Sequence, residues 1–162
     1  MKKYLLLVAI IFASCAEQKQ EPKTAGYSIR GEEESYMIGS DETTDFIRKW
    51  ADAHNERDME SILSMEKADI KIELPDGTVI NGQDEHSKVL ESFFANNVTW
   101  KPYWMLPYNS VVAKETWVIA GFALTSNVDG EENVVLHMGD IQLEDGLVSR
   151  IIVYENQRPK KQ

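Results

Sequence analysis

Histidine is the side chain that most readily exchanges a proton near neutral pH, and two of the three histidines fall on predicted inward faces. His54 follows Trp50 by one helical turn on the apolar stripe of a predicted helix. His137 lies on the same face of a predicted strand as Ile141. If both faces point inward, His54 and His137 line one cavity and could act there as catalytic acid or base. The alternative is two partly buried, hydrogen-bonded histidines without a catalytic role.

The histidines do not predict a metal centre. His86 lies near the start of a predicted third helix and is expected to be exposed, and no two of the three histidines are close in sequence. The chain has one cysteine and no His-x-x-x-His pair. It also lacks a Gly-x-Ser-x-Gly elbow, a glycine-rich phosphate loop and a dinucleotide fingerprint. We therefore expect neither a metal nor a cofactor, with a metal site assembled only by the fold as the alternative.

Aromatic residues are numerous and could line an apolar cavity. Trp50, Trp104, Trp117 and Phe122 are the ones that we expect to contact a ligand. The alternative for each is packing in the core or on the sheet, because large aromatic side chains dominate burial. A further alternative is that residues 100–107 form a surface through which two copies of the chain dimerise.

The elements that position these residues are helices first and strands afterwards. A helix begins at Ser40 or Asp41, Asp58 caps a second helix, and residues 83–94 form a third. A strand over 70–74 lies between the second and third helices. Further strands are predicted over 103–106, 110–114, 116–125, 134–143 and 147–154, with turns between them that include residues 107–109. This order predicts an α+β fold in which helices cover one face of a mostly antiparallel sheet.

The N-terminus has the order of features found in bacterial lipoprotein precursors. Two lysines precede an apolar stretch over 4–12, which is too short to span a bilayer because a spanning helix takes about 20 residues. The word Phe12-Ala13-Ser14-Cys15 resembles a lipobox, whose cysteine becomes an acylated N-terminus. The resemblance implies a signal peptide over 1–14, a lipidated Cys15 with a flexible tether to residue 40, a domain over 41–157 and a polar tail over 158–162. An ordinary cleaved signal is the alternative.

Charge and the residue after the cysteine bear on location and partners. Ala16 follows Cys15, and in such lipoproteins a residue other than aspartate there favours the outer membrane over retention in the inner one. We therefore expect a cell-envelope protein held to a membrane by lipid on Cys15. The formal net charge is −10 and becomes more negative once the lysines of the signal are removed. This balance argues against nucleic acid as a partner, because phosphate contacts need Lys and Arg.

Several short sequence motifs occur along the chain in the order that is known from one superfamily. They are Asn55-Glu56-Arg57-Asp58, Ala68-Asp69-Ile70, Gly82, Phe93-Phe94-Ala95-Asn96 and Asp145-Gly146-Leu147-Val148. In this order, residues 46–154 resemble the nuclear transport factor 2-like superfamily, and within it the SnoaL-like and ketosteroid-isomerase-like branch. The resemblance implies a cone-shaped fold whose curved sheet and helices enclose a pocket. It also implies an outer sheet face through which members often form homodimers.

The positions that carry isomerase chemistry in that branch are changed here. The base position before Pro75 holds Leu74, which cannot move a proton, and the tyrosine position of the oxyanion hole holds Trp50. The second acid falls at Gly139 or Asp140. Ketosteroid isomerase chemistry is therefore disfavoured, Leu74 is expected to line the pocket, and Asp140 joins the two histidines as a candidate catalytic residue.

These features together predict a lipid-anchored SnoaL-like domain that binds a small, largely apolar molecule with or without catalysis. One alternative is a cofactor-free cyclase, isomerase or dehydratase that uses His54, His137 or Asp140 as acid or base. Another is a structural lipoprotein that binds a partner through its sheet face. Likeness of fold does not by itself decide among these functions.

Overall fold

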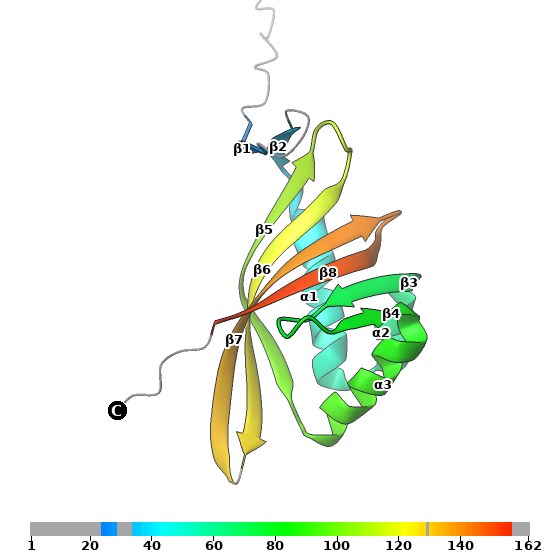
Figure 1. Ribbon diagram of the computed structural model, residues 1–162, viewed down its shortest axis with the longest axis vertical. Coiled ribbons are helices and arrows are strands. Elements are labelled where there is room, and N and C mark those ends of the chain that lie inside the picture. The colour runs from blue at the N-terminus through cyan, green and yellow to red at the C-terminus, as the bar shows by residue number, and fades with distance from the viewer. Residues whose placement is uncertain (1–23, 29–33, 129, 157–162) are drawn as a thin grey trace, which may run out of the picture.

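The computed structural model describes residues 24–28, 34–128 and 130–156, in which helices pack on one face of a curved sheet (Figure 1). The helices are α1 (Asp41–Glu56), α2 (Met59–Ser64) and α3 (Gly82–Ala95). The strands are β1 (Gly26–Ser28), β2 (Glu34–Ile38), β3 (Glu66–Glu73), β4 (Val79–Asn81), β5 (Thr99–Ser110), β6 (Thr116–Val128), β7 (Glu131–Glu144) and β8 (Leu147–Asn156). The predicted α+β class is confirmed.

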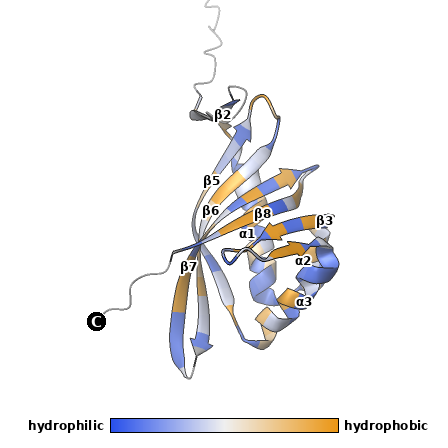
Figure 2. Cartoon of the chain, in the orientation of Figure 1, coloured by the Kyte–Doolittle hydropathy of each residue, from blue (hydrophilic) through white to orange (hydrophobic). Residues whose placement is uncertain are grey.

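All described strands belong to one sheet, in the order β1-β2-β5-β6-β7-β8-β3-β4. Strands β5 to β8 form an antiparallel meander, and β3 pairs with β8 in parallel. The pairing of β6 with β7 runs without a register shift from Thr116↔Leu143 to Val128↔Glu131. Because side chains alternate between faces along a strand, this register fixes which residues of β7 can reach the helices. Bands of apolar and polar residues along these strands are visible in Figure 2.

The core lies between α1 and the concave side of the sheet. Ile47, Trp50, Ala53 and His54 are buried along α1, as the predicted stripe requires. Val118, Ala120 and Phe122 of β6 are buried in the same core. The burial of such side chains contributes about 1.5–3 kcal/mol each for the larger ones, which is the main stabilising contribution for a domain without a disulfide. The α1 stripe therefore holds Trp50 and His54 against the sheet.

Side chains at the end of α1 tie the helix to the start of β5. The helix ends at Arg57, whose backbone is left-handed with φ 64°. Its guanidinium donates to the carbonyls of His54 and Val98, at 3.2 and 2.9 Å. The Asn55 side chain accepts from the backbone N–H of Trp100 at 2.8 Å and donates to its carbonyl at 2.9 Å. These contacts place Trp100 beside the last turn of α1.

Strand β5 differs from the sequence prediction, which placed a turn over 107–109 and a separate strand over 110–114. The structure continues β5 through Pro107 to Ser110. The N–H and the C=O of one residue point to the same side of a strand. A proline is therefore tolerated where that side faces away from the neighbouring strand whose ladder must stay intact. The Pro107 carbonyl accepts from Gly39 N–H on the side away from β6, so the missing N–H does not interrupt the ladder to β6. The chain bends only over residues 111–113.

The N-terminal segment also differs from its prediction. The tether was expected to reach residue 40, but β2 pairs with β5 and β1 pairs with β2, so both extend the sheet. Glu34 accepts from the backbone N–H groups of Val112 and Ala113, at 2.8 and 3.1 Å. The predicted signal peptide over 1–14, Cys15 and the tail over 158–162 lie outside the described residues. Within the described part of the chain, no helix is long and apolar enough to cross a membrane.

Candidate functional site

A small apolar pocket of about 140 Å³ lies between α1, α3 and the sheet. Its lining is mostly aliphatic and aromatic, and the polar side chains in it are those of His54, His86 and His137. An apolar cavity of about 150 Å³ takes up one benzene ring, so the volume suits a ligand or a ligand fragment of that size. Few polar groups in an apolar wall are typical of small-molecule sites. The pocket is therefore the candidate functional site.

Glu66 supplies a buried carboxyl group beside this pocket. It is the first residue of β3, and 3% of its surface is exposed. Trp50 Nε1 donates to Glu66 Oε1 at 2.9 Å, and His86 Nδ1 shares a proton with Oε2 at 3.0 Å. Both oxygens thus have a partner, as a buried carboxyl group requires.

His86 was predicted to be exposed, and that prediction is wrong, because only 5% of its surface is accessible. The reason is how α3 begins. The Gln83 side chain donates to the carbonyls of Leu63 and Glu66, at 2.6 and 3.0 Å, and so fixes the first turn of α3 over the start of β3. Residues three apart share a helix face, so His86 also points toward β3.

His54 is held in one tautomer. Its Nδ1 lies 2.7 Å from the Trp50 carbonyl, which can only accept, so Nδ1 carries the proton. The other nitrogen, Nε2, then has a free lone pair. Burial lowers the pKa of His54 to about 4, the Trp50 carbonyl opposes this shift, and His86 adds to it by like charge. His54 is therefore neutral near pH 7.

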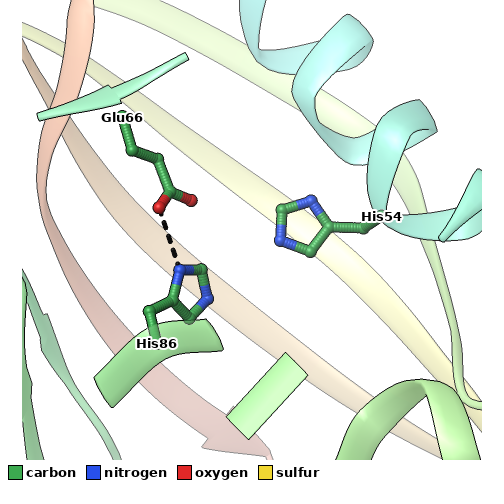
Figure 3. A group of neighbouring side chains, drawn as sticks. All are labelled: His54, Glu66 and His86. Atoms are coloured by element: carbon green, nitrogen blue, oxygen red, sulfur yellow. Dashed lines mark hydrogen bonds and ion pairs between the residues drawn. The ribbon is translucent and has the colours of Figure 1, made fainter. Parts of the chain in front are cut away.

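His54, Glu66 and His86 converge from α1, β3 and α3, and their side chains point toward one another in Figure 3. One potential ligand atom from each lies within 4.8 Å of the others, so the group could hold a metal ion. Sequence reasoning missed Glu66 because the strand was predicted to begin at Ile70. Alternation from buried Ile70 and Ile72 gives no signal for Glu66, because Ala68 is exposed and the register with β8 shifts between Glu66 and Lys71.

The structure separates the other two predicted catalytic residues. His137 lines the pocket, and its Nε2 lies 3.5 Å from a carboxylate oxygen of Glu155. Burial lowers the pKa of His137, and Glu155 opposes this shift. Asp140 is an odd number of positions away along β7 and lies on the opposite face, where it accepts from the Tyr154 hydroxyl at 3.3 Å. Burial raises the pKa of Asp140, but its carboxylate is not brought to the histidines.

The predicted ligand-contacting residues also divide between the two faces. Trp50, His54 and Leu74 line the pocket, whereas Phe122 is fully buried behind it and stacks on Trp100 with ring centroids 4.1 Å apart. Trp104 and Trp117 are outside the lining, on the other face of the sheet.

A break in the register of β5 explains the position of Trp104. Pro102 pairs with Phe122 and Trp104 with Gly121, so one extra residue lies between the two pairs. Such a bulge reverses the alternation of side chains that follow it. Trp100 therefore points inward, and Trp104 is 39% exposed on the outer face. Trp117 stacks on Tyr108 with centroids 6.3 Å apart.

Comparison with known proteins places the fold. No protein-family model matches the sequence, and no curated protein matches it. Solved structures do match. A proposed ketosteroid isomerase from Kribbella flavida has a TM-score of 0.61 and 18% identity, covering 77% of this chain and 85% of its own. SalBIII, an epoxide hydrolase/cyclase-like enzyme with a role in pyran ring formation in the polyether salinomycin, has a TM-score of 0.61 and 16% identity, covering 71% and 91%.

A third match is a proposed polyketide cyclase from Xanthomonas campestris, with a TM-score of 0.57 and 14% identity, covering 70% of this chain and 90% of its own. At identities this low, the TM-scores establish likeness of fold alone. The chain therefore has the nuclear transport factor 2-like fold of the ketosteroid-isomerase-like and SnoaL-like proteins, as the sequence words predicted. Its site departs from the isomerase pattern at Leu74 and adds a buried Glu66–His86 pair.

Proposed function

We propose that this domain binds a small, largely apolar molecule and exchanges a proton with it through His86, as a cofactor-free cyclase, isomerase or dehydratase would. The observation that carries the proposal is the buried Glu66–His86 pair in the wall of an apolar pocket. A base oriented by a buried carboxyl group is a recurring arrangement in acid–base catalysis.

The proton step follows from the hydrogen bond. When the shared proton sits on Nδ1, the opposite nitrogen Nε2 carries a lone pair and can take a proton from a carbon or hydroxyl of the ligand. The positive charge that forms on the imidazole is then stabilised by the Glu66 carboxylate 3.0 Å away. Returning the proton to another ligand atom completes an isomerisation or cyclisation without a net change in protons. The neighbours whose names include isomerase and cyclase support this class of reaction.

The test uses cyclohexanone, a six-membered ring ketone matched to the pocket volume. We expect the wild-type protein, treated with EDTA, to accelerate exchange of the ketone's α-hydrogens for deuterium in D₂O, followed by NMR. His86→Gln should slow that exchange by about 10²–10⁴-fold, the usual contribution of a general base. Glu73→Gln, a change on β3 outside this pocket, should leave the exchange unchanged. No acceleration by the wild-type protein, or full activity in His86→Gln, would remove the catalytic part of the proposal.

Binding without catalysis is the second candidate, and one observation favours it. Glu66 is fully partnered by Trp50 and His86, and His54 bonds Trp50, so the polar groups of the pocket are stabilised without a substrate. We expect the purified protein then to retain an apolar molecule detectable by mass spectrometry of a solvent extract. An empty extract together with no displacement by ring ketones would count against it.

The remaining expectations concern anchoring. We propose that Cys15 carries lipid and holds the domain at a membrane, in keeping with the lipobox-like word before it. The outer membrane is the expected location because Ala16 follows the cysteine. The resemblance of residues 12–15 to a lipobox supports the lipid, and Ala16 supports the location.

A further inference from the structure

We propose that His54, Glu66 and His86 bind one divalent transition-metal ion of the zinc type. The three residues come from separate elements and are buried, with 4%, 3% and 5% of their surfaces exposed. One ligand atom from each lies within 4.8 Å of the other two, and Figure 3 shows the rings and the carboxyl group facing one another. Imidazole nitrogen and carboxylate oxygen are ligands that Zn²⁺ takes at about 2.0–2.2 Å.

The separations suit a tetrahedral ion after a small movement. Two ligand atoms on such an ion are about 3.3 Å apart, given bonds of that length. Glu66 Oε2 and His86 Nδ1 are already 3.0 Å apart. With one ligand atom taken from each of the three residues, the separations are no more than 4.8 Å. Side-chain rotations that shorten them by about 1.5 Å or less would therefore complete the ligand set.

The protons can be accounted for without leaving the site. The ion replaces the proton that Glu66 Oε2 and His86 Nδ1 share, and that proton moves to His86 Nε2, so the imidazole stays neutral. His54 keeps its Nδ1–H on the Trp50 carbonyl and offers Nε2 as ligand. Glu66 Oε1 keeps the Trp50 indole N–H. Hydrogen bonds from residues that do not themselves bind the ion orient the metal ligands and fix the tautomers of the histidines.

The ion and the proposed substrate would use the same groups. Because His54 and His86 line the pocket, a fourth position on the ion would face it and could hold water. The ion would take the carboxylate and the imidazole that proton exchange needs, so we expect Zn²⁺ to inhibit exchange of cyclohexanone hydrogens. The metal site does not depend on the proposed function, since binding of the ion is measured directly.

The experiment titrates Co²⁺ and Zn²⁺ into purified, EDTA-stripped protein carrying Cys15→Ser, which removes the single thiol. Calorimetry should give one site per chain, and Co²⁺ should show the strong visible absorption of a four-coordinate ion. His54→Gln, Glu66→Gln and His86→Gln should each weaken binding by about 100-fold or more, because loss of groups that only support metal ligands already costs 10–100-fold. His137→Gln, a change to a histidine of the same pocket outside the cluster, should alter affinity by less than about threefold, since the three proposed ligands remain.

NMR of the ring nitrogens keeps the proposal testable if the cluster variants do not fold. The chain has three histidines, so His137→Gln identifies its own signals and leaves the other two as those of His54 and His86. Zn²⁺ should shift the ring nitrogens of His54 and His86 and leave those of His137. The proposal is overturned by the absence of a stoichiometric site, by binding that survives all three cluster changes, or by shifts confined to His137.

Discussion

Glu66 is the residue on which the candidate site depends. Its two oxygens connect Trp50 of α1 to His86 of α3, so one side chain of β3 holds both helices at the pocket. Trp50 also fixes His54, because its backbone carbonyl accepts a hydrogen bond from His54 Nδ1. The orientation of His54 and His86 therefore follows from buried hydrogen bonds made by Trp50 and Glu66.

Removal of the Glu66 carboxyl group should destabilise the domain strongly. Glu66→Ala leaves the Trp50 indole N–H without its acceptor and opens a cavity, which together should cost about 2–4 kcal/mol of unfolding free energy. Glu73→Ala is the matched control on the same strand. Its carboxylate is partly exposed and pairs with Lys71 and Arg150, so its loss should cost about 1 kcal/mol or less. Urea unfolding at pH 7 measures both, and equal costs would contradict the assigned role of Glu66.

His54 should make stability depend on pH below neutrality. Its pKa falls from 6.5 to about 4 on folding because the ring is buried. Between these values the unfolded chain binds more protons than the folded one, so stability is present above pH 6.5 and is lost as pH falls toward 4. The loss amounts to about 3 kcal/mol at most. Urea unfolding at pH 7 and pH 4.5 should show that His54→Gln loses less unfolding free energy between these pH values than the wild-type protein does. The same loss in both proteins would rule out this role of His54.

At the scale of the elements, the sequence predicted the three helices and the strands β3, β6, β7 and β8, but not β1, β2 and β4 or the details that build the site. The start of α1 and the Asp58 cap of α2 were predicted, because apolar periodicity and capping residues are local signals. The bulge of β5 and the continuation of that strand through Pro107 were not, because they depend on pairing with β6 and β2. The burial of His86 likewise depends on Gln83 reaching carbonyls of α2 and β3.

The junction of α1 with β5 should be sensitive to Asn55. Asn55→Ala leaves the N–H and the carbonyl of Trp100 without their side-chain partner, and should cost about 1–3 kcal/mol. Asn96→Ala removes an exposed bond to the Ser92 carbonyl and should cost about 0.5 kcal/mol or less. Thermal unfolding gives the two costs. Because Trp100 lines the pocket, Asn55→Ala should also change Trp100 fluorescence, and an unchanged spectrum and melting temperature would refute the proposed junction.

At the scale of the whole molecule, an apolar row crosses the outer face of the sheet. Trp104 pairs with Gly121, Gly121 with Met138, and Met138 with Tyr154, so the row spans β5 to β8. Its side chains are exposed by 39%, 43% and 49%. An exposed apolar row of this kind is a candidate interface, and we propose a second copy of the chain as the partner that covers it.

Disruption of that row should separate a homodimer. Met138→Glu places a charge in the middle of the row, where burial of an unpaired carboxylate is costly, and should shift sedimentation from dimer to monomer. Val112→Glu is the control, since Val112 is an apolar residue 53% exposed in the bend after β5, away from the row. A wild-type protein that sediments as a monomer at all accessible concentrations would exclude pairing through this face.

Lipid on Cys15 would hold the whole molecule at a membrane. Each buried CH₂ of an acyl chain contributes about 0.8 kcal/mol, so one chain anchors marginally and several anchor stably. If Cys15 is acylated, the chain expressed in a bacterial host should incorporate labelled palmitate and partition into the detergent phase. Cys15→Ser should lose both properties and keep the unfolding midpoint, because the described core is supplied by residues between Phe46 and Val153. A wild-type chain that is cleaved but carries no label would instead indicate an ordinary secretion signal. In that case the domain would not be lipid-anchored, and the pocket and the sheet face would be the parts of the molecule left to explain its function.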